Sequence, residues 1–174
     1  MKLRTKEKEL PHQLLPPMNN GSKAKLPSIL LPYQQRVNRA IENSSVTFIE
    51  KSRRIGVTWG VGAQAVLMAA VGKSAGGMDV LYIGYNIDMT REFIDVCASW
   101  ARVFGRAAST VDEFMFKDDD EKEIKAFRIT FDSGFEIVAL SSRPRSLRGR
   151  QGCVIIDEAA FHDDLKEMMK AALA

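Results

Sequence analysis

The chain has 174 residues, of which 45% are hydrophobic, and a formal net charge of +3. This length suffices for one globular domain with a sizeable core, whereas so small a charge does not by itself indicate nucleic-acid binding. The longest apolar helical stretch, residues 61–71, is too short to cross a bilayer, and no secretory leader is expected. The two cysteines lie far apart and give no zinc pattern. The composition therefore predicts a soluble cytosolic protein with no membrane association.

The N-terminal region divides into an arm and a first helix. Residues 1–26 contain three prolines, an Asn-Asn-Gly turn and scattered lysines, which is typical of a flexible basic arm. We expect one domain over residues 27–174. Its first helix is predicted over residues 31–42, because a proline is tolerated in the first helical turn. Tyr33 and Gln34 lie near its start. Either Tyr33 packs against the helix end and Gln34 faces solvent, or the two side chains contact a ligand.

A phosphate-binding loop is the first candidate site. Residues 46–50 are predicted to form a strand, and residues 59–71 an apolar helix. The basic segment between them consists of Lys51, Ser52, Arg53, Arg54, Ile55, Gly56, Val57 and Thr58. A strand, a tight glycine turn and a helix together direct backbone N–H groups and a helix N-terminus toward phosphates.

The segment matches the phosphate-loop pattern G-x-x-x-x-G-K-[ST] only in part. Gly56 and Thr58 stand at the second glycine and at the hydroxyl that binds Mg²⁺, but Val57 occupies the lysine position. Lys51 has a stem long enough to fold back over the loop, and two neighbouring arginines suit bidentate phosphate contacts. The alternative is a solvated basic turn. Three cations in four residues are, however, costly to place together without an anion.

The middle of the chain has an α/β order. A strand is predicted over residues 78–85, followed by a helix that Asp88 caps and that ends at Phe104, with Trp100 as a core residue on its apolar face. Residues 124–131 and 135–140 alternate like two strands joined by an Asp-Ser-Gly turn. This order predicts a largely parallel central sheet flanked by helices.

A pair of carboxylates forms the second candidate site. Residues 152–156 are a continuous apolar run, which is typical of a buried strand, and Asp157 and Glu158 follow directly. Ligands of open α/β sheets bind beyond the carboxyl ends of the strands. The first carboxylate is suited to hold Mg²⁺ and the second to orient or deprotonate an attacking water. The alternative is a strand that meets a solvated helix start.

An arginine-rich segment, residues 143–150, leads into this acidic strand. Three roles remain open for it: an arginine finger or γ-phosphate sensor, a contact with DNA phosphates, or a solvated basic loop. Its position favours the first role, with Arg148 as the best single candidate, because the charge that develops at the γ-phosphate is local and desolvated. DNA phosphate contacts would instead show a steep salt dependence.

These motifs together carry a family resemblance. The basic loop at 51–58, the segment at 141–149 and the Val-Ile-Ile-Asp-Glu-Ala-Ala-Phe run at 154–161 resemble the ATPase half of tailed-phage terminase large subunits, above all the Mu-like group. The resemblance covers about residues 27–161. A deviant phosphate loop in this family carries its lysine at the first position of the loop, and Lys51 with Val57 is similar to that version.

The resemblance implies a RecA-like P-loop NTPase of the ASCE class, truncated after the Walker B strand, with ATP and Mg²⁺ as cofactors. The backbone of residues 52–58 would cradle the phosphates, and Lys51 and Arg53 would neutralise their charge. Thr58 and Asp157 would hold Mg²⁺. Which of Lys51, Arg53 and Arg54 makes the decisive phosphate contact stays open.

The same resemblance gives roles to three further residues and to partners. Glu158 would polarise the attacking water, Tyr33 would stack on adenine and Gln34 would hydrogen-bond the edge of the base. ATP hydrolysis would drive double-stranded DNA into a procapsid. A homo-oligomeric ring on a portal protein, a terminase small subunit and the host cytoplasm are the implied setting.

Two departures and two alternatives accompany this interpretation. The C-terminal nuclease and the segment that couples hydrolysis to movement in the family are not found before Ala174, so the sequence predicts an incomplete ATPase domain without nuclease activity. A superfamily 2 helicase is one alternative, although such motors keep the lysine that Val57 replaces. A degenerate, non-catalytic P-loop module that serves as a docking platform is the other.

Overall fold

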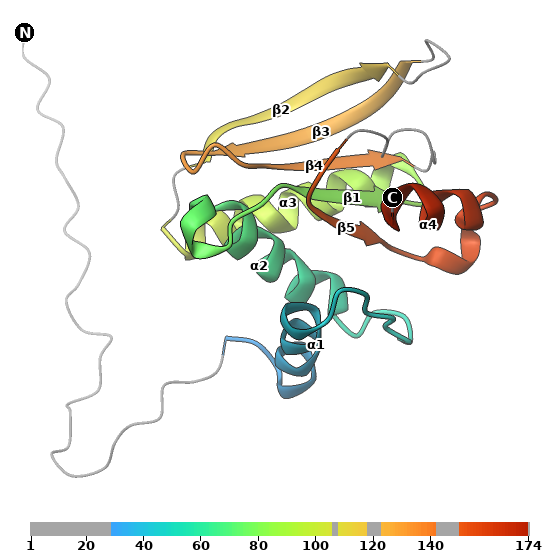
Figure 1. Cartoon of the computed structure of the whole chain (residues 1–174), viewed down its shortest axis with the longest axis horizontal. Coiled ribbons are helices and arrows are strands. Elements are labelled where there is room, and N and C mark those ends of the chain that lie inside the picture. The colour runs from blue at the N-terminus through green and yellow to red at the C-terminus, as the bar shows by residue number, and fades with distance from the viewer. Residues whose placement is uncertain (1–28, 106–107, 118–122, 142–149, 174) are drawn as a thin grey trace, which may run out of the picture.

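The computed structural model describes residues 29–105, 108–117, 123–141 and 150–173. These residues form a five-stranded sheet in the order β2-β3-β4-β1-β5, with helices on both faces (Figure 1). The strands are β1 (Val80–Gly84), β2 (Ala108–Lys117), β3 (Glu123–Phe131), β4 (Glu136–Ser141) and β5 (Cys153–Ile156). The helices are α1 (Pro32–Asn43), α2 (Val57–Ala69), α3 (Ile87–Val103) and α4 (Leu165–Leu173), with short 3₁₀ turns at Lys73–Ala75 and Ala159–Phe161.

The sheet combines a parallel and an antiparallel half. β1 pairs in parallel with β4 on one side and with β5 on the other, whereas β3 runs antiparallel to both β2 and β4. The hairpin turn between β3 and β4 follows the prediction, with Gly134 at φ +86°. The α/β class is thus confirmed, and the parallel half is the part that carries the candidate site.

The core forms on both faces of β1 because successive strand residues point to opposite sides. Tyr82 lies in the larger apolar cluster with α2 and α3, whereas Leu81 and Ile83 lie in a smaller cluster with Met168 of α4. Trp100 is 1% exposed and donates its indole N–H to the carbonyl of Trp59, which confirms it as a core residue.

The predicted helices are present with small shifts at their ends. The residue that caps α3 is Asn86, not Asp88 as predicted, because the Asn86 side chain accepts a hydrogen bond from the backbone N–H of Met89 at 2.9 Å. Gly105 ends α3 with φ +60°, as expected. The long strand β2 was not predicted. None of the described helices has the length and apolar character to span a membrane.

The strand predicted over residues 46–50 is wrong. These residues have no regular secondary structure and pair with no strand in the described part of the chain, and Phe48 is 83% exposed. A groove of about 1290 Å³ separates them from β5; its lining also includes Val61 of α2 and Met169 of α4. We call this the β5 groove. Among the strands that the structure describes, β5 pairs with β1 alone. Its other edge faces this groove, and its residues are half-buried instead of fully buried.

Candidate functional site

The acidic pair lies at the carboxyl end of β5, as the sequence predicted. The backbone N–H of Asp157 donates to the carbonyl of Ile83 at 3.1 Å, so the β1–β5 ladder extends to this residue. Glu158 then adopts a left-handed conformation with φ +50° and ψ +44°. Such a conformation costs a non-glycine residue about 1–2 kcal/mol. It turns the chain sharply after the strand, and the Glu158 N–H donates to Asp157 Oδ1 at 2.9 Å.

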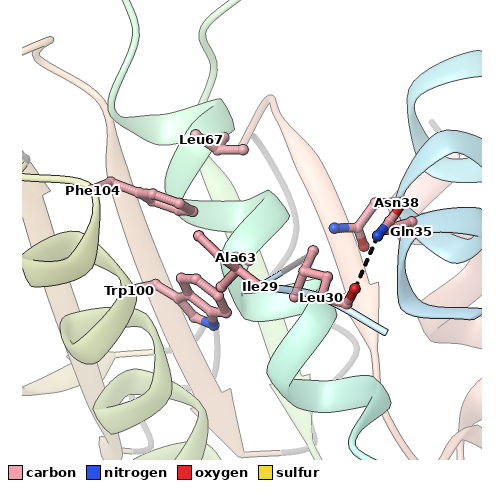
Figure 2. Close-up of a pocket in the computed structure, with 8 residues that line it drawn as sticks. All are labelled: Ile29, Leu30, Gln35, Asn38, Ala63, Leu67, Trp100 and Phe104. Atoms are coloured by element: carbon pink, nitrogen blue, oxygen red, sulfur yellow. Dashed lines mark hydrogen bonds between the residues drawn. The ribbon is translucent and has the colours of Figure 1, made fainter. Parts of the chain in front are cut away.

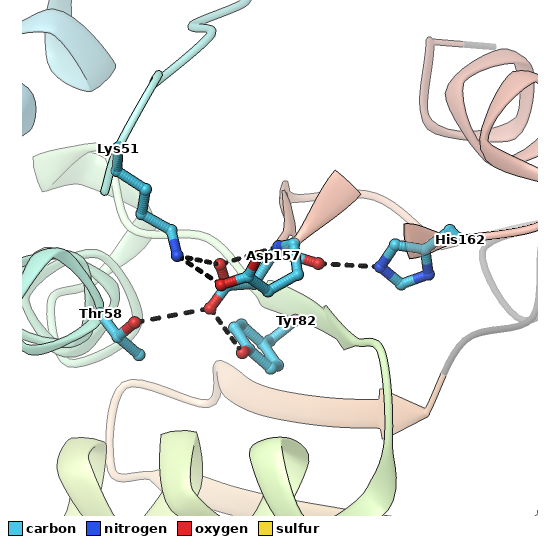
Figure 3. A network of polar contacts seen from close by, with 6 residues as sticks. Lys51, Thr58, Tyr82, Asp157 and His162 are labelled. Atoms are coloured by element: carbon cyan, nitrogen blue, oxygen red, sulfur yellow. Dashed lines mark hydrogen bonds and ion pairs between the residues drawn. The ribbon is translucent and has the colours of Figure 1, made fainter. Parts of the chain in front are cut away.

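The Asp157 carboxylate is held from β1. Tyr82 Oη donates to Asp157 Oδ2 at 3.0 Å (Figure 3). The Tyr82 ring stacks on Phe93 with centroids 3.9 Å apart. Burial, followed by the charge of Asp157, raises the pKa of Tyr82, so the phenol remains a proton donor. His162 Nε2 donates to the Asp157 carbonyl at 2.8 Å. Both the side chain and the backbone of Asp157 are therefore fixed.

Lys51 bridges the two carboxylates from the other side of the site (Figure 3). Its Nζ lies 2.8 Å from Glu158 Oε1 and 3.4 Å from Asp157 Oδ1. Partial burial alone would lower the pKa of Lys51, but the hydrogen bond to Glu158 and the charges of both carboxylates outweigh it, so the pKa is raised. The ammonium group stays charged, and it joins two segments that are 107 residues apart.

Thr58 completes the group of predicted metal ligands. It lies in the first turn of α2, and its Oγ1 is 3.5 Å from Asp157 Oδ2, which is long for a hydrogen bond. Hydroxyl and carboxylate oxygens are ligands that Mg²⁺ accepts, and it commonly takes only one or two carboxylates together with phosphate oxygens and water. The described residues contain no cluster of three or more His, Cys, Asp or Glu side chains that would hold a metal by itself. The donor set thus fits Mg²⁺ bound together with a phosphate ligand.

The loop before α2 contains two residues in the left-handed conformation. Gly56 adopts φ +77° at the N-cap of α2, and Arg54 adopts φ +58°. Arg53 and Arg54 are exposed, and neither forms an ion pair among the residues that the structure places. Val57 is 7% exposed and packs in the apolar core. A cation at that position would point into the core, so the charge must come from another residue, and Lys51 is the lysine that lies at the site.

The predicted base contacts lie beside the loop, on α1. Tyr33 Oη donates to the carbonyl of Ile55, and Gln34 Nε2 donates to the carbonyl of Gly56 at 2.7 Å. Gln35 Nε2 instead donates to the carbonyl of Leu30 at 2.9 Å. The contact of either residue with adenine stays a prediction. Arg148, its neighbours in 143–149 and the arm at 1–26 lie outside the described residues.

Two hollows flank α2, and they differ in chemistry. A smaller cavity of about 310 Å³ lies between α1, α2 and α3 and has Leu67, Trp100 and Phe104 among its walls (Figure 2). No charged side chain lines it, so it does not suit phosphates. The β5 groove reaches Lys51, Thr58, Asp157 and Glu158 and therefore opens onto the polar site.

Tyr82 and His162 are the two site residues that the sequence did not reveal. Neither belongs to a motif, and their contacts with Asp157 depend on which strand lies beside β5 and on the path of the chain after Glu158. Tyr82 lies in a strand whose residues are all buried and mostly apolar, so the sequence gives no sign that it contacts Asp157. Only the pairing of β1 with β5 brings the two residues together.

Comparison with known proteins places the chain among phage proteins. No family model and no solved structure matches it. It is 53% identical over 147 residues to the Mu-like prophage FluMu protein gp28 of Haemophilus influenzae, which covers 84% of this chain and 28% of that protein. It is 47% identical over 149 residues to the probable terminase large subunit gp28 of Escherichia phage Mu, covering 84% of this chain and 27% of that protein. The chain thus spans little more than a quarter of each relative, and over that stretch it belongs with the gp28 proteins of Mu-like phages, the group that includes a probable terminase large subunit.

Proposed function

We propose that this chain is the ATP-binding and ATP-hydrolysing part of a terminase large subunit, which powers the packaging of double-stranded DNA into a procapsid. One observation carries the proposal: Lys51, Thr58, Asp157 and Glu158 come together at the N-terminus of α2 and the carboxyl edge of β5. A loop with a left-handed glycine before a helix and two acids after a neighbouring strand are the two halves of a nucleotide site. The RecA-like P-loop fold is part of this proposal.

Different residues of the site would bind the phosphates, hold Mg²⁺ and activate the attacking water. The backbone of residues 52–58 would receive the phosphates, assisted by Arg53. Thr58 Oγ1 and the Asp157 carboxylate would hold Mg²⁺, which supplies charge neutralisation at the β- and γ-phosphates when bound. Glu158 would orient and deprotonate the attacking water. Tyr82 would keep the Asp157 carboxylate in place during these steps.

Lys51 would have different ionic partners in the free protein and in the nucleotide complex. In the structure its ammonium group neutralises Asp157 and Glu158. A phosphate group at the loop would compete with the carboxylates for the Lys51 ammonium group. Once that group leaves Glu158, the Glu158 carboxylate would be free to act as a base. Lys51 would thus serve as counter-ion of the acids in the free protein and of the phosphates in the complex, a role that the buried side chain of Val57 cannot take.

The wider setting is proposed from the resemblance to terminase large subunits. A homo-oligomeric ring, a portal protein, a terminase small subunit and double-stranded DNA would be the partners, in the cytoplasm of the host. Arg148 would reach the γ-phosphate as a finger or sensor, in its own subunit or a neighbouring one.

The experiment that tests the proposal is a calorimetric titration with Mg²⁺ and a non-hydrolysable ATP analogue. We expect wild-type protein to bind the analogue, Lys51→Ala to weaken binding about tenfold or more, and Glu158→Gln to retain binding. In a separate phosphate-release assay with Mg²⁺ and ATP, we expect Glu158→Gln to abolish the hydrolysis shown by wild-type protein. Absence of binding by folded wild-type protein, or full hydrolysis by Glu158→Gln, would contradict it.

A degenerate docking module is the second candidate, and one observation favours it. Lys51 is engaged by both carboxylates, so a nucleotide has to displace it. A folded chain that binds no Mg²⁺-nucleotide in the same titration would support this second candidate.

A further inference from the structure

The contacts between α1 and α2 repeat with a constant offset in the sequence. Gln34 donates to the Gly56 carbonyl at 2.7 Å, Asn38 donates to the Gly60 carbonyl at 3.1 Å, and Gln64 donates to Glu42 at 3.1 Å. Each pair is 22 residues apart, as is the Tyr33–Ile55 pair. Residues four apart share one face of a helix. We call these contacts the α1–α2 ladder; it lies along one face of each helix.

The first two rungs of the α1–α2 ladder hold the phosphate loop itself. Tyr33 and Gln34 bind the carbonyls of two consecutive residues, Ile55 and Gly56. In a trans peptide the carbonyl and the following N–H point in opposite directions. Fixing these two carbonyls on α1 therefore turns the N–H groups of Gly56 and Val57 away from α1. These are among the N–H groups at the start of a helix that have no partner within it.

Gln34 is held in place by its surroundings, and its side chain has little freedom to leave the loop. Its side chain is 5% exposed, and its Oε1 accepts a hydrogen bond from the backbone N–H of Leu31 at 2.9 Å while its Nε2 binds the loop. It also lies against two glycines, Gly60 of α2 and the N-cap residue Gly56. A Cβ on Gly60 would come within 3.0 Å of Gln34 Cβ, and one on Gly56 within 3.1 Å of Nε2. Reaching the edge of a base would break both hydrogen bonds and vacate a fitted position.

We propose that Gln34, assisted by Tyr33, is a positioning residue that sets the direction of the loop N–H groups, and that it does not read the base. The inference rests on the proposed function, because it assigns these N–H groups to phosphates. A base contact would affect adenine nucleotides alone, whereas a loop-positioning residue affects every ligand that carries the same phosphates.

The test compares three ligands on two variants. We would titrate ATP, GTP and inorganic tripolyphosphate, each with Mg²⁺, into wild type, Gln34→Met and Glu42→Met. Methionine preserves length and removes the hydrogen bonds. Glu42 is the matched control, because it forms the rung of the same ladder that lies farthest from the loop. We expect Gln34→Met to weaken all three ligands by a similar factor of about five to ten, and Glu42→Met to leave them within about twofold.

A loss for ATP alone, or no loss for any ligand, would overturn the proposal. If wild type bound no polyphosphate, the proposed function would fail, and a second measurement would still decide the role of Gln34. The backbone N–H of Gly60 donates to the Gly56 carbonyl at 3.3 Å. We expect its hydrogen exchange to accelerate in Gln34→Met but not in Glu42→Met; equal exchange in the two variants would refute the positioning role.

Discussion

At the scale of single residues, the candidate site depends on contacts that fix Asp157 before any ligand arrives. Tyr82 holds one carboxylate oxygen, the Glu158 N–H holds the other, and His162 holds the backbone carbonyl. A metal ligand that is already oriented loses less conformational freedom on binding. If Asp157 holds Mg²⁺ as proposed, the Tyr82 hydroxyl would contribute to the affinity without contacting the metal.

Removal of that hydroxyl is the first prediction. Tyr82→Phe keeps the ring stacked on Phe93 and deletes the hydrogen bond to Asp157. We expect the Mg²⁺ concentration that supports half-maximal nucleotide binding to rise about tenfold. Loss of a group that orients a metal ligand typically lowers metal affinity by roughly 10–100-fold, and the Glu158 N–H still holds the other carboxylate oxygen in this variant. A titration of Mg²⁺ at fixed nucleotide measures it. Phe93→Leu, which removes the stack alone, serves as the control, and an unchanged Mg²⁺ requirement in Tyr82→Phe would contradict the assignment.

The Lys51 bridge gives the second prediction, which concerns pH. The pKa of Lys51 in the folded protein is raised above its ordinary value of 10.5, so the contribution of Lys51 to stability is fully present below pH 10.5 and is lost as the pH rises through the folded pKa. We expect Lys51→Met to be less stable than wild type by at most about 1 kcal/mol, the usual range for accessible ion pairs. Urea unfolding at a series of pH values should show a constant gap from pH 8 to 10 that closes above 10.5. A gap that widens there would rule out this bridge.

At the scale of elements, α2 connects the loop to the core, and its glycines allow α1 to approach. Gly60→Ala is the third prediction. Alanine favours a helix by up to about 1 kcal/mol over glycine, yet its Cβ would press on Gln34 at 3.0 Å, and overpacking costs about 1–3 kcal/mol. We expect a net loss of stability together with weaker polyphosphate binding, measured by thermal unfolding and calorimetry. Gly72→Ala, where no atom lies within 4 Å of the new Cβ, should show neither effect.

Sequence patterns predicted most helices and strands, because hydrophobic periodicity and helix capping depend on residues that are close in the sequence. They placed β1, the β3–β4 turn, the helices and the acidic pair, but failed at residues 46–50, which read as a strand yet have no described neighbour to pair with. Strand formation depends on a partner as much as on propensity. The contacts of Tyr82 and Lys51 with Asp157 were equally out of reach, since they depend on strand order and on segments about 75 and 106 residues away in sequence.

At the scale of the whole molecule, the β5 groove lies between the apolar edge of β5 and the exposed apolar segment at residues 46–49. Its lining includes Val46, Phe48 and Ile49, each at least 37% exposed. Exposed apolar surface of this kind binds amphiphilic dyes. The fourth prediction is that Phe48→Ser lowers the fluorescence of bound anilinonaphthalene sulfonate by about half while changing stability by less than about 0.5 kcal/mol. Phe161→Ser, at an exposed residue outside the groove lining, should leave the dye signal unchanged.

The open edge of β5 also has a consequence for how the protein behaves at high concentration. β5 is an uncharged run of β-favouring residues, Cys153, Val154, Ile155 and Ile156, and within the described ranges only its β1 side carries a paired strand. Unpaired strand edges of this composition recruit strands from other molecules. Two copies that add their β5 edges to each other would close both grooves at once. Apparent mass measured across a dilution series should therefore rise with concentration, and a ligand that fills the groove should oppose that rise.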